Sequence, residues 1–195
     1  HEECGVFGIY SERDDQRVAS SAYLALYALQ HRGQEGAGIA CADDRDIVCR
    51  KGCGLLTEVF HTENLAELHG HSCIGHVRYA TAGGNELENV QPLVARSYLG
   101  SVAVVHNGQI VNAAALRREL EEKGSIFRGT SDSEIILHLI QGGTGTLLEK
   151  IEAACRRLEG AFSFLILTEK NLYAIRDKNG IRPLSIGRTA GGSWC

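Results

Sequence analysis

The order of strand-like and helix-like segments limits the fold of this 195-residue chain more than any other feature. Segments with strand character come mostly as neighbouring pairs joined by short polar turns, whereas segments with helical periodicity come partly in a block. A parallel sheet would require strict alternation of strands and helices. The pattern therefore predicts an α+β domain in which antiparallel sheets are covered by helices.

Strands are expected at residues 4–9, 36–42, 46–51, 73–79, 101–106, 109–111, 161–168, 172–176 and 184–187. Helices are expected at residues 18–31, 62–68, 112–123 and 147–158, with a further helix that starts at a capping box, Ser131-Asp132-Ser133-Glu134. Gly33 and Gly124 are placed to end two of these helices, Gly33 in the left-handed conformation. Asn107-Gly108 between two β-branched runs predicts a hairpin turn, because both residues tolerate positive φ.

Composition excludes several classes of partner. The formal charge of −4, with Lys and Arg scattered, provides no basic field for nucleic acid. No window approaches the roughly 20 apolar residues of a membrane span, and the acidic start His1-Glu2-Glu3 is unlike a signal peptide. We therefore expect a cytoplasmic protein with neither a nucleic-acid nor a membrane partner.

The seven cysteines are an odd number at irregular spacing, which indicates reduced thiols rather than a disulfide framework. An alternative is a zinc site built from Cys49, Cys53, His69, His71 and Cys73. The spacing of these residues fits no tight zinc knuckle, and no metal site is predicted.

A thiol and four polar clusters are the candidates for chemistry. Cys4 leads into an apolar strand-like run, and Gln30–Glu35 is a charged turn that leaves a helix. Arg78 is a fork that could hold a carboxylate in two parallel hydrogen bonds or simply pair with an acid. Asn107-Gly108 offers an amide beside an unhindered N–H, as an oxyanion hole requires, and Asp132 could face an ammonium group or a helix dipole. Together they are suited to acyl transfer on an amino acid.

Six stretches of the sequence resemble the N-terminal class II glutaminase domain of the amidophosphoribosyltransferase family. They are residues 3–9 (ECGVFGI), 30–39 (QHRGQEGAGI), 74–83 (IGHVRYATAG), 88–93 (ENVQPL), 106–112 (HNGQIVN) and 130–134 (TSDSE). Glucosamine-6-phosphate synthase is a less similar alternative, because it typically has a tryptophan where this chain has Tyr79. A non-catalytic glutamine-binding module is a second alternative.

The resemblance implies an N-terminal nucleophile hydrolase fold, a four-layer αββα sandwich with antiparallel sheets. It implies that glutamine is hydrolysed to glutamate and ammonia through a thioester. The implied site residues are Cys4 as nucleophile, Asn107 and Gly108 as oxyanion hole, Arg78 with Thr81 as carboxylate ligands, Asp132 as ammonium ligand, and Arg32 as a residue that orders the site.

The resemblance also implies three segments: a propeptide remnant at 1–3, the glutaminase domain at 4–187, and a tail or truncation point at 188–195 before a missing phosphoribosyltransferase domain. In the full enzyme the ammonia would pass to phosphoribosyl pyrophosphate, the first step of purine synthesis. No cofactor is expected in this chain. Mg²⁺, and in some family members a 4Fe-4S cluster, is expected with the missing domain, and the full-length enzyme is expected to be a homo-oligomer.

Overall fold

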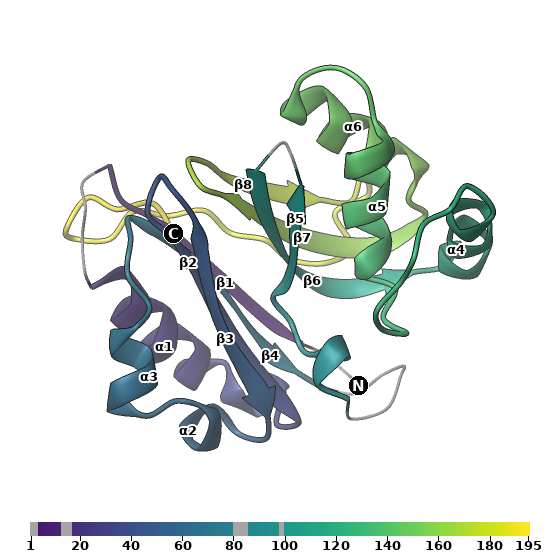
Figure 1. Cartoon of the computed structure of the whole chain (residues 1–195). Helices are drawn as coiled ribbons and strands as arrows, with labels where there is room; N and C mark the ends of the chain where they lie inside the picture. Colours follow the sequence, from purple (N-terminus) through teal and green to yellow (C-terminus); the bar gives the residue numbers. More distant parts are fainter. Residues whose placement is uncertain (1–3, 13–16, 80–85, 98–99) are drawn as a thin grey trace.

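The computed structural model describes residues 4–12, 17–79, 86–97 and 100–195 (Figure 1). The strands are β1 (Gly5–Tyr10), β2 (Gly36–Ala42), β3 (Ile47–Cys53), β4 (Ser72–Arg78), β5 (Leu93–Ser97), β6 (Gly100–Ile110), β7 (Gly160–Thr168) and β8 (Leu172–Arg176). The α-helices are α1 (Val18–Ala28), α2 (Leu56–Val59), α3 (Thr62–Ala66), α4 (Ala113–Glu122), α5 (Glu134–Gly142) and α6 (Leu147–Arg157). Two 3₁₀ turns are η1 (Gln30–Arg32) and η2 (Leu87–Asn89).

The strands form two antiparallel four-stranded sheets, in the orders β1-β4-β2-β3 and β5-β6-β7-β8. Helices α1, α2 and α3 lie on the outer side of the first sheet, and α5 and α6 lie on the outer side of the second (Figure 1). Between the sheets is a core of small and aliphatic side chains, including Ala40, Ala42, Ile74, Ala103 and Leu165. The predicted α+β architecture of four layers is confirmed.

Helix α6 illustrates how local sequence sets an element. The Thr146 side chain accepts a hydrogen bond from the Glu149 N–H, and the Glu149 carboxylate accepts one from the Thr146 N–H, which is a capping box. Ile151 and Ala154 then recur at helical spacing and are buried against the second sheet. At the end of α4, Gly124 has φ of +94°, so its predicted role as a helix terminator is confirmed.

The predicted hairpin at Asn107-Gly108 is wrong. Both residues lie inside the continuous strand β6, opposite Ser163 and Phe162 of β7. Gly108 does have a positive φ of +142°, but a Cβ at this position would lie 2.0 Å from the Ala161 carbonyl oxygen. The glycine therefore permits close approach of the neighbouring strand, where the sequence suggested a reversal of the chain.

Three other local predictions are also wrong. Gly33 has φ of −159° and is extended, not left-handed. The predicted capping box at 131–134 is not formed, because Ser133 is the N-cap of α5 and makes no side-chain cap bond. Residues 184–187 are irregular instead of forming a strand, and Trp194 beyond them pairs with Tyr10 through two 2.8 Å backbone hydrogen bonds.

The expectation of fully reduced cysteines is corrected at one pair. Cys41 and Cys73 face each other in the register of β2 and β4, with a Cα–Cα distance of 4.1 Å, and form a disulfide. Their separation of 32 residues concealed this pairing, which depends on strand register. Among the described residues, no group of three or more His, Cys, Asp or Glu side chains could hold a metal ion.

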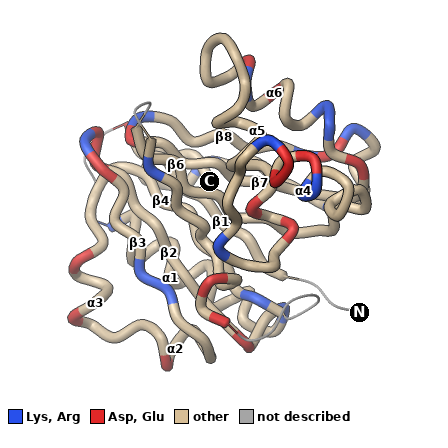
Figure 2. Tube along the Cα trace, turned by 45° about the vertical axis from the view of Figure 1, so that its right-hand side comes forward, with Lys and Arg blue, Asp and Glu red and all other residues tan. Residues whose placement is uncertain are grey.

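Charged residues of both signs are distributed along the whole trace (Figure 2). Within the described ranges, no helix is long and apolar enough to cross a membrane.

Candidate active site

A cavity of about 440 Å³ opens between the ends of the two sheets. It is lined by five of the residues singled out from the sequence: Cys4, Arg78, Asn107, Gly108 and Asp132. Cys4 precedes β1 and Arg78 ends β4 in the first sheet, whereas Asn107 and Gly108 belong to β6 of the second. The fold therefore brings together residues that are up to 128 positions apart in the sequence.

Cys4 is half-buried, and its Sγ lies 3.7 Å from the Tyr79 carbonyl oxygen. Burial raises the pKa of the Cys4 thiol above its ordinary value of 9.0, because a thiolate loses hydration there. A backbone hydrogen bond with Tyr79 and the positive charges of Arg78 and Arg182 lower the pKa without cancelling this effect. The thiol is therefore protonated near neutral pH and needs a base before it can act as a nucleophile.

The backbone around Arg78 is held by the turn that follows α1. A Cβ on Gly33 would lie 2.6 Å from the Arg78 carbonyl carbon, so only glycine allows the turn to pack against the end of β4. In the same turn, the Arg32 Nε donates a 3.1 Å hydrogen bond to the Cys4 carbonyl oxygen. Arg78 itself is 5% exposed and lines the cavity. One turn thus fixes both the thiol-bearing residue and the arginine.

Asp132 lies just before α5, with its carboxylate at the cavity. Its Oδ2 accepts a 2.9 Å hydrogen bond from the Ile110 N–H at the end of β6. The Ser133 hydroxyl lies 3.4 Å from Asp132 Oδ1. These contacts leave the carboxylate with unused acceptor capacity toward the cavity, since an ionised carboxylate can accept about four hydrogen bonds.

Two buried amides that sequence reasoning did not assign hold the loop that carries Asp132. The Asn89 Oδ1 accepts hydrogen bonds from the Thr130 N–H at 2.9 Å and the Ser131 N–H at 3.0 Å. The Gln91 Oε1 accepts a 2.6 Å bond from the His106 N–H, and its Nε2 donates a 3.0 Å bond to the Ser133 hydroxyl. The only hint of this role in the sequence is that Asn89 and Gln91 alternate with other residues in the short run ENVQPL.

Two buried histidines join the sheets behind the cavity. His76 of β4 donates from Nε2 to the His106 carbonyl oxygen of β6 at 3.2 Å. The His106 Nδ1 lies 2.9 Å from the Ser133 hydroxyl, and its ring stacks on Phe164. Burial lowers the pKa of His76 to about 3 and that of His106 to about 4, so both imidazoles are neutral at pH 7.

The remaining candidates are placed as follows. Thr81 lies outside the described residues. His31, within the charged turn Gln30–Glu35 singled out above, is exposed, with its Nδ1 3.1 Å from the Ala28 carbonyl oxygen, and does not line the cavity. Arg182, which the sequence did not single out, lies in the irregular segment after β8. It lines the cavity, and its positive charge lowers the pKa of Cys4. Its presence at the cavity could not be predicted, because an irregular segment has no periodicity that shows where its side chains point.

The chain belongs to the glutamine amidotransferase domain family, whose model matches residues 76–195. Among curated proteins, it is 50% identical over 96% of its length to amidophosphoribosyltransferase from Bacillus subtilis (strain 168). It is also 50% identical over 95% of its length to amidophosphoribosyltransferase from Methanocaldococcus jannaschii. The chain spans about two fifths of these relatives, 39% of the first and 40% of the second.

Solved structures agree with this assignment. The glutamine phosphoribosylpyrophosphate amidotransferase from B. subtilis, complexed with ADP and GMP, matches 97% of this chain and 40% of its own, at 46% identity and a TM-score of 0.89. A glutamine aminotransferase class-II domain protein from Silicibacter pomeroyi, at 16% identity and a TM-score of 0.62, shows the fold alone. The fold is that of the N-terminal nucleophile hydrolases, as the sequence resemblance implied.

Proposed function

We propose that this chain hydrolyses glutamine to glutamate and ammonia through a thioester on Cys4. The observation that carries the proposal is the meeting of a thiol, a buried arginine, a carboxylate and an asparagine–glycine pair in one cavity. A thiol nucleophile, clamps for both charged ends of an amino acid and an oxyanion hole are together what amide cleavage of glutamine requires.

Glutamine would be held by opposite charges at its two α-substituents. The buried Arg78 guanidinium would bind the α-carboxylate in two parallel hydrogen bonds, with Thr81 proposed as a second ligand. Asp132, fixed by the Ile110 N–H, would accept hydrogen bonds from the α-ammonium group. Arg32 would order the site through its bond to the Cys4 carbonyl oxygen. This places the side-chain amide of glutamine toward the thiol.

In the first chemical step, Cys4 Sγ attacks the amide carbon, and the carbonyl oxygen becomes negatively charged. The Asn107 side-chain amide and the Gly108 N–H would stabilise that charge. The base returns the thiol proton to the leaving nitrogen, the tetrahedral state collapses with release of ammonia, and water then hydrolyses the γ-glutamyl thioester to glutamate.

The base that removes the thiol proton is proposed to be the α-amine of Cys4 itself. A terminal amine has a pKa of about 7.7 to 8.0, much closer to that of the thiol than the buried imidazole of His106 at about 4. Residues 1–3 convert this nitrogen into an amide, which has no usable basicity. We therefore propose that the chain is inactive as printed, and that cleavage of the Glu3–Cys4 bond activates it.

Intact-mass analysis paired with a glutamate-release assay tests this proposal. Turnover should appear only in protein that lacks residues 1–3, and a glutamine-like electrophile should then label Cys4. Cys4→Ser should release no glutamate, whereas Cys53→Ser, a change at an exposed cysteine, should retain full activity. Full turnover by protein whose mass still includes residues 1–3 would refute the amine as base. Preferential labelling of Cys53 would refute Cys4 as nucleophile.

We further propose that the whole protein passes ammonia to phosphoribosyl pyrophosphate in the first step of purine synthesis. The support is the identity of about 50% to proteins with the name amidophosphoribosyltransferase. The same proposal includes a cytosolic location and a homo-oligomeric full-length enzyme. It also includes Mg²⁺, and in some family members a 4Fe-4S cluster, bound outside this chain. Formation of phosphoribosylamine from glutamine by the full-length protein would test it.

A further inference from the structure

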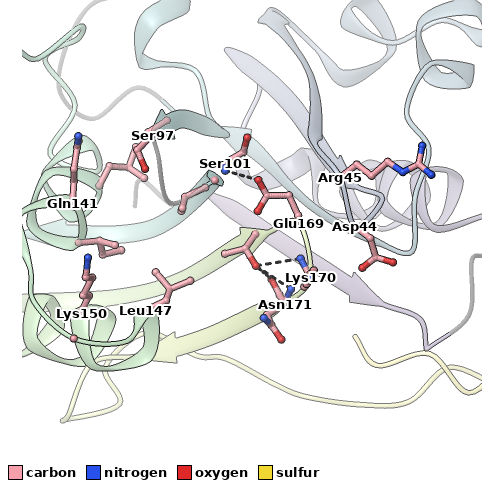
Figure 3. Close-up of a pocket in the computed structure, with 17 residues that line it drawn as sticks. Asp44, Arg45, Ser97, Ser101, Gln141, Leu147, Lys150, Glu169, Lys170 and Asn171 are labelled. Atoms are coloured by element: carbon pink, nitrogen blue, oxygen red, sulfur yellow. Dashed lines mark hydrogen bonds between the residues drawn. The ribbon is translucent and has the colours of Figure 1, made fainter.

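A second cavity, of about 420 Å³, lies at the other end of β6 from the glutamine cavity (Figure 3). It is lined by Ser101 and Val102, whereas the first cavity is lined by Asn107 and Gly108. At about 3.3 Å per residue, Val102 and Asn107 are roughly 17 Å apart along the strand. The volume falls within the usual range for small-molecule sites, about 300 to 1,000 Å³.

The interior of this second cavity is mainly apolar. Leu137 and Ile140 reach it from α5, Leu147 from α6 and Val102 from β6. The turn between β7 and β8 supplies a polar edge, where Glu169 accepts a hydrogen bond from the Ser101 N–H (Figure 3). An occupant would therefore need an apolar body of modest size.

One charged side chain interrupts the apolar lining. Lys150 lies on the buried face of α6 with Ile151 and Ala154, is only 6% exposed, and lines the cavity. Figure 3 shows its side chain extending from α6 toward Gln141 of α5. Within the described part of the chain, its amino group makes no hydrogen bond or ion pair, and its Nζ keeps some accessible surface although the stem is buried. An amino group that reaches a mainly apolar cavity without a protein partner is free to bind a ligand there.

Nearby carboxylates are engaged with other groups. Glu149 is held by the Thr146 N–H and hydroxyl in the α6 capping box. Glu152 pairs with Arg156 on the exposed side of α6, and Glu169 holds the start of β6. Asp44, Arg45 and Lys170 also line the cavity, and Figure 3 shows them on the side away from Lys150. The apolar side of the cavity therefore carries the Lys150 amino group with no acid paired to it.

A purely structural role for Lys150 is the alternative. Its stem packs on Gly143, where a Cβ would lie 3.1 Å from Lys150 Cγ. This position is beside the end of α5, and positive charge near a helix C-terminus is favourable. A structural role predicts that neutralising Lys150 lowers the Tm of the protein. A ligand-binding role predicts that the Tm of the unliganded protein does not fall.

We propose that the second cavity binds a small amphipathic monocarboxylate, with its carboxylate on Lys150 and its apolar body against Leu137, Ile140 and Leu147. The single positive charge of the Lys150 ammonium group can be neutralised by the single negative charge of a carboxylate. A phosphate dianion would bring a second negative charge into a cavity that Asp44 and Glu169 also line.

Calorimetric titration of the purified chain with octanoate and with 1-octanol tests the proposal. Octanoate should bind at least tenfold more tightly than octanol. Lys150→Met should remove at least nine tenths of the octanoate affinity, leave octanol binding unchanged, and give an unliganded Tm no lower than that of the original chain. Lys170→Met, at an exposed lysine that also lines the cavity, should change octanoate binding less than twofold.

Four results would overturn the proposal. They are absence of saturable octanoate binding, equal affinity for octanoate and octanol, unchanged octanoate affinity in Lys150→Met, and loss of octanoate binding after alkylation of Cys4, which would place the probe in the glutamine cavity. Octyl phosphate that bound more than tenfold tighter than octanoate would replace the carboxylate by a phosphate as the ligand class. A lower Tm of unliganded Lys150→Met would support the structural role.

Discussion

Replacing Gln91 by Leu should destabilise the fold and weaken glutamine binding together. The side chain is 5% exposed, and its amide accepts from the His106 N–H and donates to the Ser133 hydroxyl. Leucine keeps a similar volume, so the main effect is the loss of partners for two buried polar groups. Each such group costs about 1 to 3 kcal/mol, and Ser133 retains its contact with His106 Nδ1. We expect a loss of about 2 to 4 kcal/mol in the free energy of unfolding.

The kinetic effect follows from the position of Asp132 next to Ser133. A loosened loop should weaken the proposed ammonium contact and raise KM for glutamine roughly tenfold, about 1.4 kcal/mol, with a smaller change in kcat. Urea unfolding and glutamate release, measured on one preparation of processed protein, give both quantities. Gln141→Leu, at an exposed position of α5, is the matched control and should change neither. Loss of less than about 0.5 kcal/mol with unchanged KM would refute the role of the buried amide.

Arg78→Lys should raise KM for glutamine at least tenfold, because a point ammonium cannot replace a fork that forms two hydrogen bonds worth about 1.5 to 3 kcal/mol; unchanged KM and kcat would remove Arg78 from the site. Asn107→Ala should lower kcat by roughly 10² to 10³ with little change in Tm. Gly108→Ala should instead lower Tm sharply, since its Cβ would lie 2.0 Å from the Ala161 oxygen; the reverse pattern would contradict both assignments. Burial lowers the pKa of His76 to about 3 and of His106 to about 4, so unfolded chains bind protons that the folded state excludes. The free energy of unfolding should therefore fall by roughly 2 kcal/mol per histidine from pH 6.5 to pH 5, and His76→Gln should reduce this slope by about half; a flat profile in urea titrations would refute it.

Sequence patterns predicted helices and the fold class better than they predicted turns. Helix α6 and the α+β class could be predicted, because helical and strand periodicity are local signals. Three glycines show where local signals succeed and where they fail. Gly124 ends a helix as expected, whereas Gly33 and Gly108 permit close approach to backbone that is distant in sequence. A single sequence does not distinguish a glycine that turns the chain from one that admits a neighbouring strand.

The sequence singled out side chains that the fold brings to one cavity, but not the residues that hold them in place. Cys4, Arg78 and Asp132 are a thiol, a guanidinium and a carboxylate beside predicted strands or a predicted helix start, and they line one cavity. Asn89 and Gln91 act by holding backbone from other elements, which depends on tertiary placement. The same reason concealed the disulfide, whose two cysteines meet only through strand register.

The division of the cavity between two sheets has a consequence for the dynamics of the domain. Arg78 belongs to one sheet and Asn107 to the other, so a bound glutamine would contact both. A ligand that binds only the folded state stabilises it by about 2.7 kcal/mol at a concentration of 100 Kd. Because the ligand bridges both sheets, its effect extends beyond the cavity: amide hydrogen exchange should slow in the core between the sheets, around Ala40 and Ala103.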